Sequence, residues 1–371
     1  MSVKNVLFLS FLVFGCSWAE AREMIQPIES VRSLGMGGVH IYDNDNASNM
    51  FLNPAALGFT QGLNLNVFDV NVGINGLELA NSLSAGGGMS GFESLSTMYG
   101  TNVWIGANYW LSYAMPYFGV GMYSKTFTTF RLNNPPYPNM DFTLFSDTGY
   151  VLGGALPLGP AMAFGINAKK IMRVGGTAAI GPDELSNISG TGLTSYFTQS
   201  GYAYALDVGF MMQAPVPTTP TLSVTWQDVG DARFIANPGK TAPDHIDDNL
   251  MMSLTAHGDI PLLGWAAGFE YRHITDSKEQ LGKKLHFGAE ASLAFIDIRA
   301  GFYQGYTSYG VGLDMWLFQL DLASYSVEKG VYPGQTADSR IQAAISVNLG
   351  FDPDFKLTDF GGKKRKLKQR R

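Results

Sequence analysis

Ten ionisable side chains lie in segments where apolar and polar residues alternate, and they are the first candidates for chemistry. If the apolar positions face lipid, all ten face the interior of a barrel: Lys169, Asp207, Glu270, Arg272, His286, Glu290, Arg299, Asp314, Asp321 and Arg340. Charges of both signs on neighbouring strands favour a structural salt-bridge network, because an unpaired buried charge is costly. A polar channel lining or a ligand site is the alternative.

Their spacing does not match a known catalytic or metal site. His286 and Glu290 share a face, but no serine nucleophile lies at a recognisable spacing. The histidines show no metal-binding pattern, and neither a Gly-x-Ser-x-Gly motif nor a phosphate-binding loop occurs. We therefore expect no enzymatic activity, no cofactor and no metal.

The composition narrows the class of fold. The 371 residues are 46% hydrophobic, 13% aromatic and only 15% charged, with 44 glycines, whereas soluble domains are about 25% charged. High apolar content with little charge excludes a disordered chain. A helical membrane protein is excluded because no apolar run of about 18 residues follows the N-terminus. A large soluble β-protein or a membrane β-barrel remains.

The alternating stretches favour the barrel. Their polar faces carry small residues and few charges, which suits a crowded barrel interior better than a water-exposed surface. Aromatic residues gather near strand ends, as in an interfacial girdle: Trp104, Tyr109, Trp110, Tyr113, Tyr117 and Phe118. The pattern predicts strands over 63–74, 102–114, 117–129, 142–156, 161–173, 201–213, 221–229, 249–258, 264–275, 284–294, 297–304, 308–316, 318–327 and 339–351.

Long and short connections alternate between these stretches, and both chain ends fall on the side of the short turns. Outer-membrane barrels have short periplasmic turns and longer outer loops. We therefore predict an all-β protein, a transmembrane antiparallel β-barrel of about 14 strands spanning residues 63–351. It should lie in the outer membrane of a Gram-negative cell, with both termini in the periplasm.

The two ends of the chain have other features. Residues 1–21 have the charged start, short apolar core and Ala19-Glu20-Ala21 site of a cleaved signal peptide, with lipidation at Cys16 as the alternative. Residues 352–371 form a predicted periplasmic tail, which holds seven basic residues and no acid from residue 363 onward. This tail is expected to be a solvated end; binding to anionic lipid is the alternative. Without a folded recognition motif, no nucleic-acid partner is expected.

Residues 22–62 do not alternate. They hold Arg32-Ser-Leu-Gly-Met-Gly-Gly38, an Asp- and Asn-rich stretch over 43–48, and Asn53-Pro-Ala-Ala-Leu57. The order of these motifs resembles the N-terminal region of FadL-type outer-membrane transporters of hydrophobic compounds and of the related PorV and TraF-like barrels. Downstream segments at 165–171, 205–209, 299–302, 325–330 and 338–340 are also similar to that superfamily.

The resemblance implies a 14-stranded barrel in which residues 22–62 form a luminal plug or hatch. In FadL-type transporters a hydrophobic substrate enters from outside and leaves through the barrel wall, whereas PorV-type members handle secreted proteins. The candidate plug motif is Asn53, Pro54 and Ala55. It is interpreted as turn chemistry that fits the plug to the wall, with direct substrate contact as the alternative.

The leading functional hypothesis is uptake or passage of hydrophobic small molecules that are fatty-acid-like or lipid-like. The alternative is a self-associating structural, scaffold or porin-like barrel with lipid or secreted-protein partners. Small lipid-facing residues would allow such barrels to pack closely: Ala267, Ala289, Ala291, Ala300 and Ala343. Expected partners are outer-membrane lipid, the barrel-assembly machinery, a hydrophobic ligand and, in the alternative, further copies of the chain.

Overall fold

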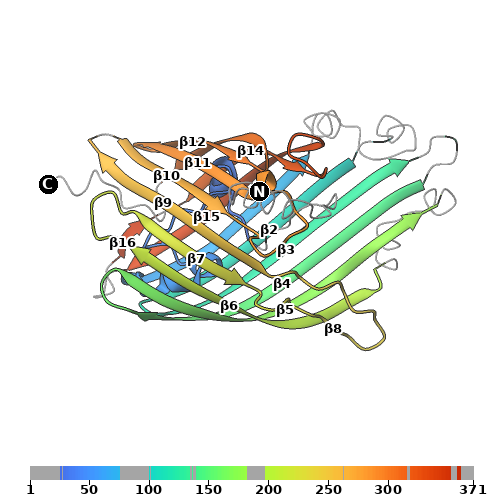
Figure 1. Ribbon diagram of the computed structural model, residues 1–371, viewed down its shortest axis with the longest axis horizontal. Coiled ribbons are helices and arrows are strands. Elements are labelled where there is room, and N and C mark those ends of the chain that lie inside the picture. Colours follow the sequence, from blue (N-terminus) through green and yellow to red (C-terminus); the bar gives the residue numbers. More distant parts are fainter. Residues whose placement is uncertain are drawn as a thin grey trace, which may run out of the picture.

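A closed antiparallel β-barrel dominates the computed structural model (Figure 1). The structure describes residues 26, 28–75, 100, 102–133, 136, 139–181, 197–261, 263–315, 318–351 and 357–360. The ring closes because β1 (Leu63–Asn75) pairs with β15 (Ala337–Phe351) over the length of β1. The predicted signal peptide, Cys16 and the basic end of the tail lie outside the described residues.

Fourteen strands form the ring in the described part of the chain, which confirms the predicted fold class and strand number. Between β1 and β15 they are β2 (Asn102–Met115), β3 (Phe118–Asn133), β4 (Asn139–Pro157), β5 (Met162–Ile180), β6 (Gln199–Gln213), β7 (Thr221–Gln227), β9 (Asn249–Ile260), β10 (Leu263–Tyr271), β11 (Leu285–Leu293), β12 (Ile296–Tyr303), β13 (Tyr306–Asp314) and β14 (Gln319–Glu328). Two short strands add to the sheet outside the ring: β8 (Ile235–Ala236) on β6 and β16 (Leu357–Phe360) on β15.

The helices are short: α2 (Val31–Gly35), α3 (Asn49–Leu52), the 3-10 helix η1 (Pro54–Gly58) and α7 (Leu281–Lys284). Among the residues described, no helix is both long and apolar enough to cross a membrane.

Strands β3 to β5 are longer than the sequence predicts, at 16, 19 and 19 residues. The ladder between β4 and β5 continues to Met140 and Ile180, beyond the predicted ends. The residues that extend β5, 174–180, are mostly Gly and Ala, and Thr177 among them pairs with Thr143. Small residues on both faces give little apolar alternation although backbone pairing continues, so the predicted strand was too short.

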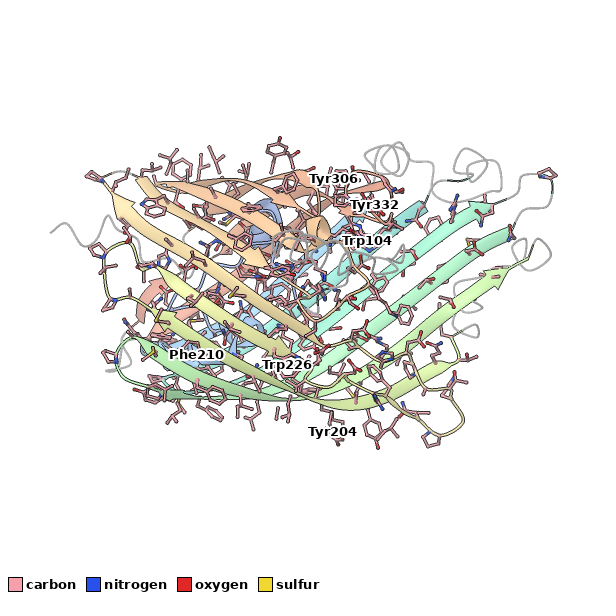
Figure 2. All side chains as sticks on the ribbon, in the orientation of Figure 1. Trp104, Tyr204, Phe210, Trp226, Tyr306 and Tyr332 are labelled. Atoms are coloured by element: carbon pink, nitrogen blue, oxygen red, sulfur yellow. The ribbon has the colours of Figure 1, made fainter. Side chains whose placement is uncertain are left out.

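The outside of the ring is apolar and the inside is polar. Leu152, Leu254 and Ile298 point outward with 53%, 57% and 53% of their surface exposed. Tyr204 is 67% exposed and projects away from the ring (Figure 2). Buried positions on the same strands hold Asn, Ser, Thr and charged residues. An apolar exterior matches a lipid environment. The closed ring also pairs the backbone groups of its strands, which lipid requires because it offers them no hydrogen bonds.

Residues 28–62 occupy the inside of the ring, and we call them the luminal segment (Figure 1, blue). Their buried apolar residues pack against several different parts of the wall. Met50, Phe51 and Leu57 join a cluster with Trp110 of β2 and Tyr123 of β3. Val31 and Leu34 join another cluster, with side chains of β12, β14 and β15. Contacts around so much of the ring place this segment in the lumen.

Wall glycines bring the luminal segment close to the strand backbone. A Cβ on Gly301 would lie 2.2 Å from the Gly37 nitrogen, and one on Gly165 would lie 2.3 Å from the carbonyl carbon of Pro54. Gly37 has a φ of 69°, and a Cβ there would lie 2.2 Å from the Phe287 oxygen. Conformation and close approach therefore both require glycine at position 37.

We predict that Gly301→Ala lowers the free energy of unfolding by about 1–3 kcal/mol, because the added methyl overpacks a rigid backbone contact. Gly154→Ala is the matched control, since a Cβ there would meet only one atom, at 4.0 Å. Urea unfolding of the refolded barrel in detergent measures both. Equal midpoints for the two variants would contradict the close fit.

Candidate functional site

The first cluster of predicted luminal residues surrounds Lys169 on β5. Its Nζ lies 2.6 Å from Asp207 Oδ1 and 2.7 Å from Asp228 Oδ1. All three residues are buried. Asp228 lies in the predicted strand 221–229, but counting by twos puts it on the apolar face with Trp226. β7 instead ends at Gln227 and Asp228 has a φ of 50°, so its side chain reaches Lys169 in the lumen.

The second cluster is built on Arg299 of β12. Its guanidinium lies 2.6 Å from Glu290, 3.0 Å from Asp297 and 2.5 Å from Asp321. Asp321 is on β14, two strands away, and Gly312 on the strand between leaves the necessary space. A Cβ on Gly312 would lie 2.6 Å from the Arg299 Nη2 atom.

Arg32 of the luminal segment completes this second cluster. Its Nε and Nη2 atoms both donate to Glu290 at 2.9 Å, and its Nη1 atom lies 2.6 Å from Asp43. The paired donation to Glu290 has the geometry that makes Arg–carboxylate pairs strong. Glu290 therefore joins the wall, through Arg299, to the luminal segment.

The third cluster also joins the wall to the luminal segment. Arg272, the residue directly after β10, binds Glu270 at 2.6 Å and Glu29 at 2.7 Å, and donates to the Gly38 carbonyl. His40 Nδ1 lies 3.2 Å from Glu270, and His286 Nδ1 lies 2.8 Å from the Gly37 carbonyl oxygen. Glu29 and His40 were not predicted, because they lie in the non-alternating segment.

The remaining two predicted residues lie elsewhere. Arg340 binds Asp338 at 2.7 Å, and its guanidinium stacks 4.2 Å from the centre of the Trp104 ring. Asp314 is the last residue of β13, opposite Gln319. The ten predicted residues are thus divided among several places on the inner wall rather than gathered in one site.

The motif Asn53, Pro54 and Ala55 contacts the barrel wall. The Asn53 side chain accepts a hydrogen bond from Ala55 N at 2.8 Å and donates to Ser223 Oγ of β7 at 2.7 Å. Pro54 packs on Gly165. These contacts hold the end of the luminal segment against β5 and β7.

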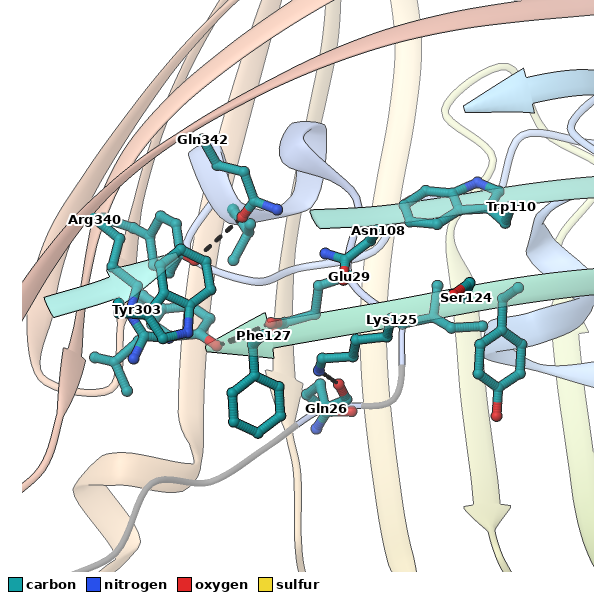
Figure 3. A pocket seen from close by; sticks show the side chains of 16 residues that line it. Gln26, Glu29, Asn108, Trp110, Ser124, Lys125, Phe127, Tyr303, Arg340 and Gln342 are labelled. Atoms are coloured by element: carbon teal, nitrogen blue, oxygen red, sulfur yellow. Dashed lines mark hydrogen bonds between the residues drawn. The ribbon is translucent and has the colours of Figure 1, made fainter. Parts of the chain in front are cut away.

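A cavity lies between the luminal segment and strands β2, β3, β12, β14 and β15. We call it the aromatic cavity, because six aromatic side chains line it (Figure 3): Trp104, Trp110, Tyr123, Phe127, Tyr303 and Tyr325. Polar and charged side chains complete the wall: Gln26, Glu29, Asn108, Ser124, Lys125, Arg340 and Gln342. The Lys125 ammonium group donates to the Gln26 carbonyl. Such a site offers ring faces to the apolar part of a molecule and hydrogen-bond partners to a polar part.

A second cavity lies nearer the short-turn end. We call it the polar cavity, because carboxylates, amides and hydroxyls line much of it: Asp43, Asp69, Asp321, Asn46, Asn66, Asn348, Gln319 and Ser346. Ile28 and Trp110 line both cavities. These two side chains therefore separate an aromatic compartment from a polar one.

Comparisons with known proteins support the fold. No protein-family model and no curated protein matches the sequence. The structure is similar to the deltaS2S3 mutant of the TodX monoaromatic hydrocarbon channel, with a TM-score of 0.51 and 12% identity over 87% of this chain and 99% of that chain. Barrels of lower TM-score include the CymD monoaromatic hydrocarbon channel (0.48, 14% identity, 86% and 97% covered) and the Ralstonia pickettii toluene transporter TbuX (0.47, 13% identity, 86% and 97% covered).

The likeness to the TodX mutant defines the class of fold, a closed antiparallel β-barrel of the kind seen in that channel. The barrel fold that the FadL-type resemblance implied is thereby confirmed.

We predict that Arg32→Met destabilises the folded barrel by about 3–5 kcal/mol, because it leaves the Glu290 and Asp43 carboxylates buried without this partner. Arg233→Met, at an exposed position after β7, is the control and should change stability by less than about 0.5 kcal/mol. The two variants are compared by their urea-unfolding midpoints, measured in the same detergent. A small effect at Arg32 would show that this ion pair does not hold the luminal segment.

The Asp43 carboxyl makes this contact dependent on pH. Burial alone would raise the pKa of Asp43, but the charge of Arg32 outweighs burial and lowers it. The stabilisation is therefore complete above the unfolded pKa of about 3.9 and is lost as the pH falls through the lower pKa of the folded state. We expect the stability difference between the wild type and Asp43→Asn to shrink as urea unfolding is repeated from pH 7 towards pH 3. A difference independent of pH would contradict the pair.

Proposed function

We propose that this protein is an outer-membrane channel that takes up small hydrophobic molecules through the aromatic cavity. The observation that carries the proposal is a ring-lined cavity inside a barrel whose exterior suits lipid. Its combination of aromatic rings with polar side chains is typical of small-molecule sites. The similar TodX and CymD structures are described as monoaromatic hydrocarbon channels, which supports this class of cargo.

The wall of the cavity favours flat or flexible apolar cargo. Tyr303 and Tyr325 meet edge to face at 5.5 Å, and Trp104 lies against the inner wall, where it packs on Gly73 and Gly106. Edge-to-face rings present both faces and edges to a ligand, which suits another aromatic ring. A fatty-acid-like or lipid-like chain is the second cargo that this lining accepts.

The luminal segment lies in the direct route across the barrel. Ion pairs to Arg272 and Glu290 and the glycine contacts hold it in place. In the proposed mechanism a molecule binds in the aromatic cavity, the side chains of Ile28 and Trp110 that border it rearrange, and the molecule leaves through the wall into lipid. The process is passive and requires no cofactor.

The same proposal includes the orientation of the barrel. The first residue of β1 and the last residue of β15 are paired with each other, at the end of the barrel where the connections are short. We place this end in the periplasm, with outer-membrane lipid around the wall and the barrel-assembly machinery as the partner during insertion.

We predict that Asn108→Trp reduces uptake at least about tenfold, because the larger side chain fills the aromatic cavity and removes well over 1.4 kcal/mol of binding. Tyr109→Trp is the matched control, since Tyr109 is the next residue on β2 and points outward with 40% exposure. The measurement is accumulation of radiolabelled toluene, and separately of dodecanoate, by Gram-negative cells expressing each variant. Heat-modifiable migration on gels confirms folding. Unchanged uptake in a folded Asn108→Trp barrel would exclude this cavity as the route.

A further inference from the structure

A β-bulge in β1 turns two oxygen-bearing side chains into the polar cavity. The register of β1 shifts between Asn66 and Phe68 against β15, and between Asn66 and Asp69 against β2. Val67 and Phe68 are consecutive, yet both are exposed on the outside, at 40% and 38%. Such a bulge re-aims the side chains that follow it. Asn66 and Asp69 therefore both line the polar cavity, although strict alternation would separate them.

Two of these oxygen atoms lack a partner among the described residues. Asn66 is 2% exposed, and its Nδ2 donates to Asn348 Oδ1 at 2.7 Å. Its own Oδ1, and the Oδ1 of Asp69, are buried without a hydrogen bond in that part of the chain. A buried acceptor without a donor costs about 1–3 kcal/mol. Acceptor oxygens that face a cavity without a hydrogen-bond donor indicate a ligand that accepts their lone pairs.

The charge around the cavity indicates the sign of that ligand. Arg32 and Arg299 bind carboxylates here, and Asp321 is close enough to Asp69 to repel it electrostatically. Two histidines are the other titratable groups. His40 belongs to the luminal segment and lines the cavity, and His257 faces Asp43 from β9. The carboxylates outnumber the two guanidinium groups: Asp43, Asp69, Glu290, Asp297 and Asp321.

We propose that the polar cavity binds a calcium ion, anchored by the carboxylate of Asp69 and the amide oxygen of Asn66. Calcium takes carboxylate, amide and water oxygens in a flexible arrangement of six to eight ligands. Asp321 and the Ser346 hydroxyl line the same cavity and supply further oxygens. No three His, Cys, Asp or Glu residues converge on a metal position in the described chain, so the amide, hydroxyl and water oxygens are essential to this site. The proposal is independent of hydrophobic uptake.

The test uses the full mature barrel in detergent, stripped of metal and titrated with terbium, an oxygen-seeking stand-in for calcium. Trp110 lines the cavity and should sensitise terbium emission. We expect saturable emission that calcium displaces, and an at least about tenfold weaker affinity in Asp69→Asn. Asp141→Asn, an exposed carboxylate near the start of β4, is the control and should bind as the wild type does.

Two further variants make the result decisive. Trp110→Phe should lose sensitised emission but keep calcium binding by calorimetry, and Asn66→Ala should weaken binding if Asp69→Asn does not fold. Calcium should also raise the unfolding temperature of the wild type more than that of Asp69→Asn. Absence of saturable binding to the wild type overturns the proposal. The proposal is also overturned if the wild type and the variants that fold bind with equal affinity.

Discussion

The pairing of β1 with β15 is the interaction on which the rest of this structure depends. It joins the two ends of the strand series from Leu63↔Phe351 to Asn75↔Arg340 and removes the open edges of the sheet. In lipid an unpaired strand edge is not tolerated, because no water satisfies its backbone groups. Once the ring is closed, each strand has one face towards lipid and one towards a confined lumen. Side chains on the outer face must then be apolar, and charged side chains on the inner face must be paired.

Confinement explains the chemistry of the lumen. Charged side chains that point inward cannot reach bulk water freely, so they are stable only in combination with opposite charges. The wall supplies part of each combination and the luminal segment supplies the rest, as Arg32 does for Glu290. Glycines on the wall let the backbone of the segment approach closely enough for these pairs to form. Pairing and close packing therefore act together, and loss of either should loosen the segment.

The sequence allowed the fold to be predicted, because lipid on one side and a confined lumen on the other impose a period of two. It also placed Lys169 and Arg299 on the inner face. It could not identify Arg32 or Asp43 as members of the luminal ion-pair clusters, since these residues lie in a segment without periodicity and are brought to the wall only by the tertiary fold. Counting by twos put Asp228 on the apolar face of a predicted strand that ends before it in the structure. The end of β5 was missed because residues 174–180 are mostly Gly and Ala, which give little contrast between the two faces.

Asp69 shows how a local irregularity hides a luminal residue. Counting by twos from Asn64 and Asn66 puts Asp69 on the lipid face, and only the bulge returns it to the lumen. The signal was present as the consecutive apolar pair Val67-Phe68 within an alternating stretch. A break of this kind in a barrel strand is a sign that the inward positions change from even to odd numbers.

The contrast between the two cavities bears on the proposed route of a hydrophobic molecule. In the aromatic cavity such a molecule gains contact with rings, and the charged groups Glu29 and Arg340 there are already held in ion pairs. Beyond Ile28 and Trp110 it would meet the carboxylates of Asp43, Asp69 and Asp321. Asp43 and Asp321 are paired with arginines, but Asp69 would have to be desolvated without compensation. The lipid outside the wall offers an apolar environment without that cost. The free energy of the molecule therefore favours exit sideways over passage through the polar cavity, and the same carboxylates that oppose apolar cargo are the ones that suit a bound cation.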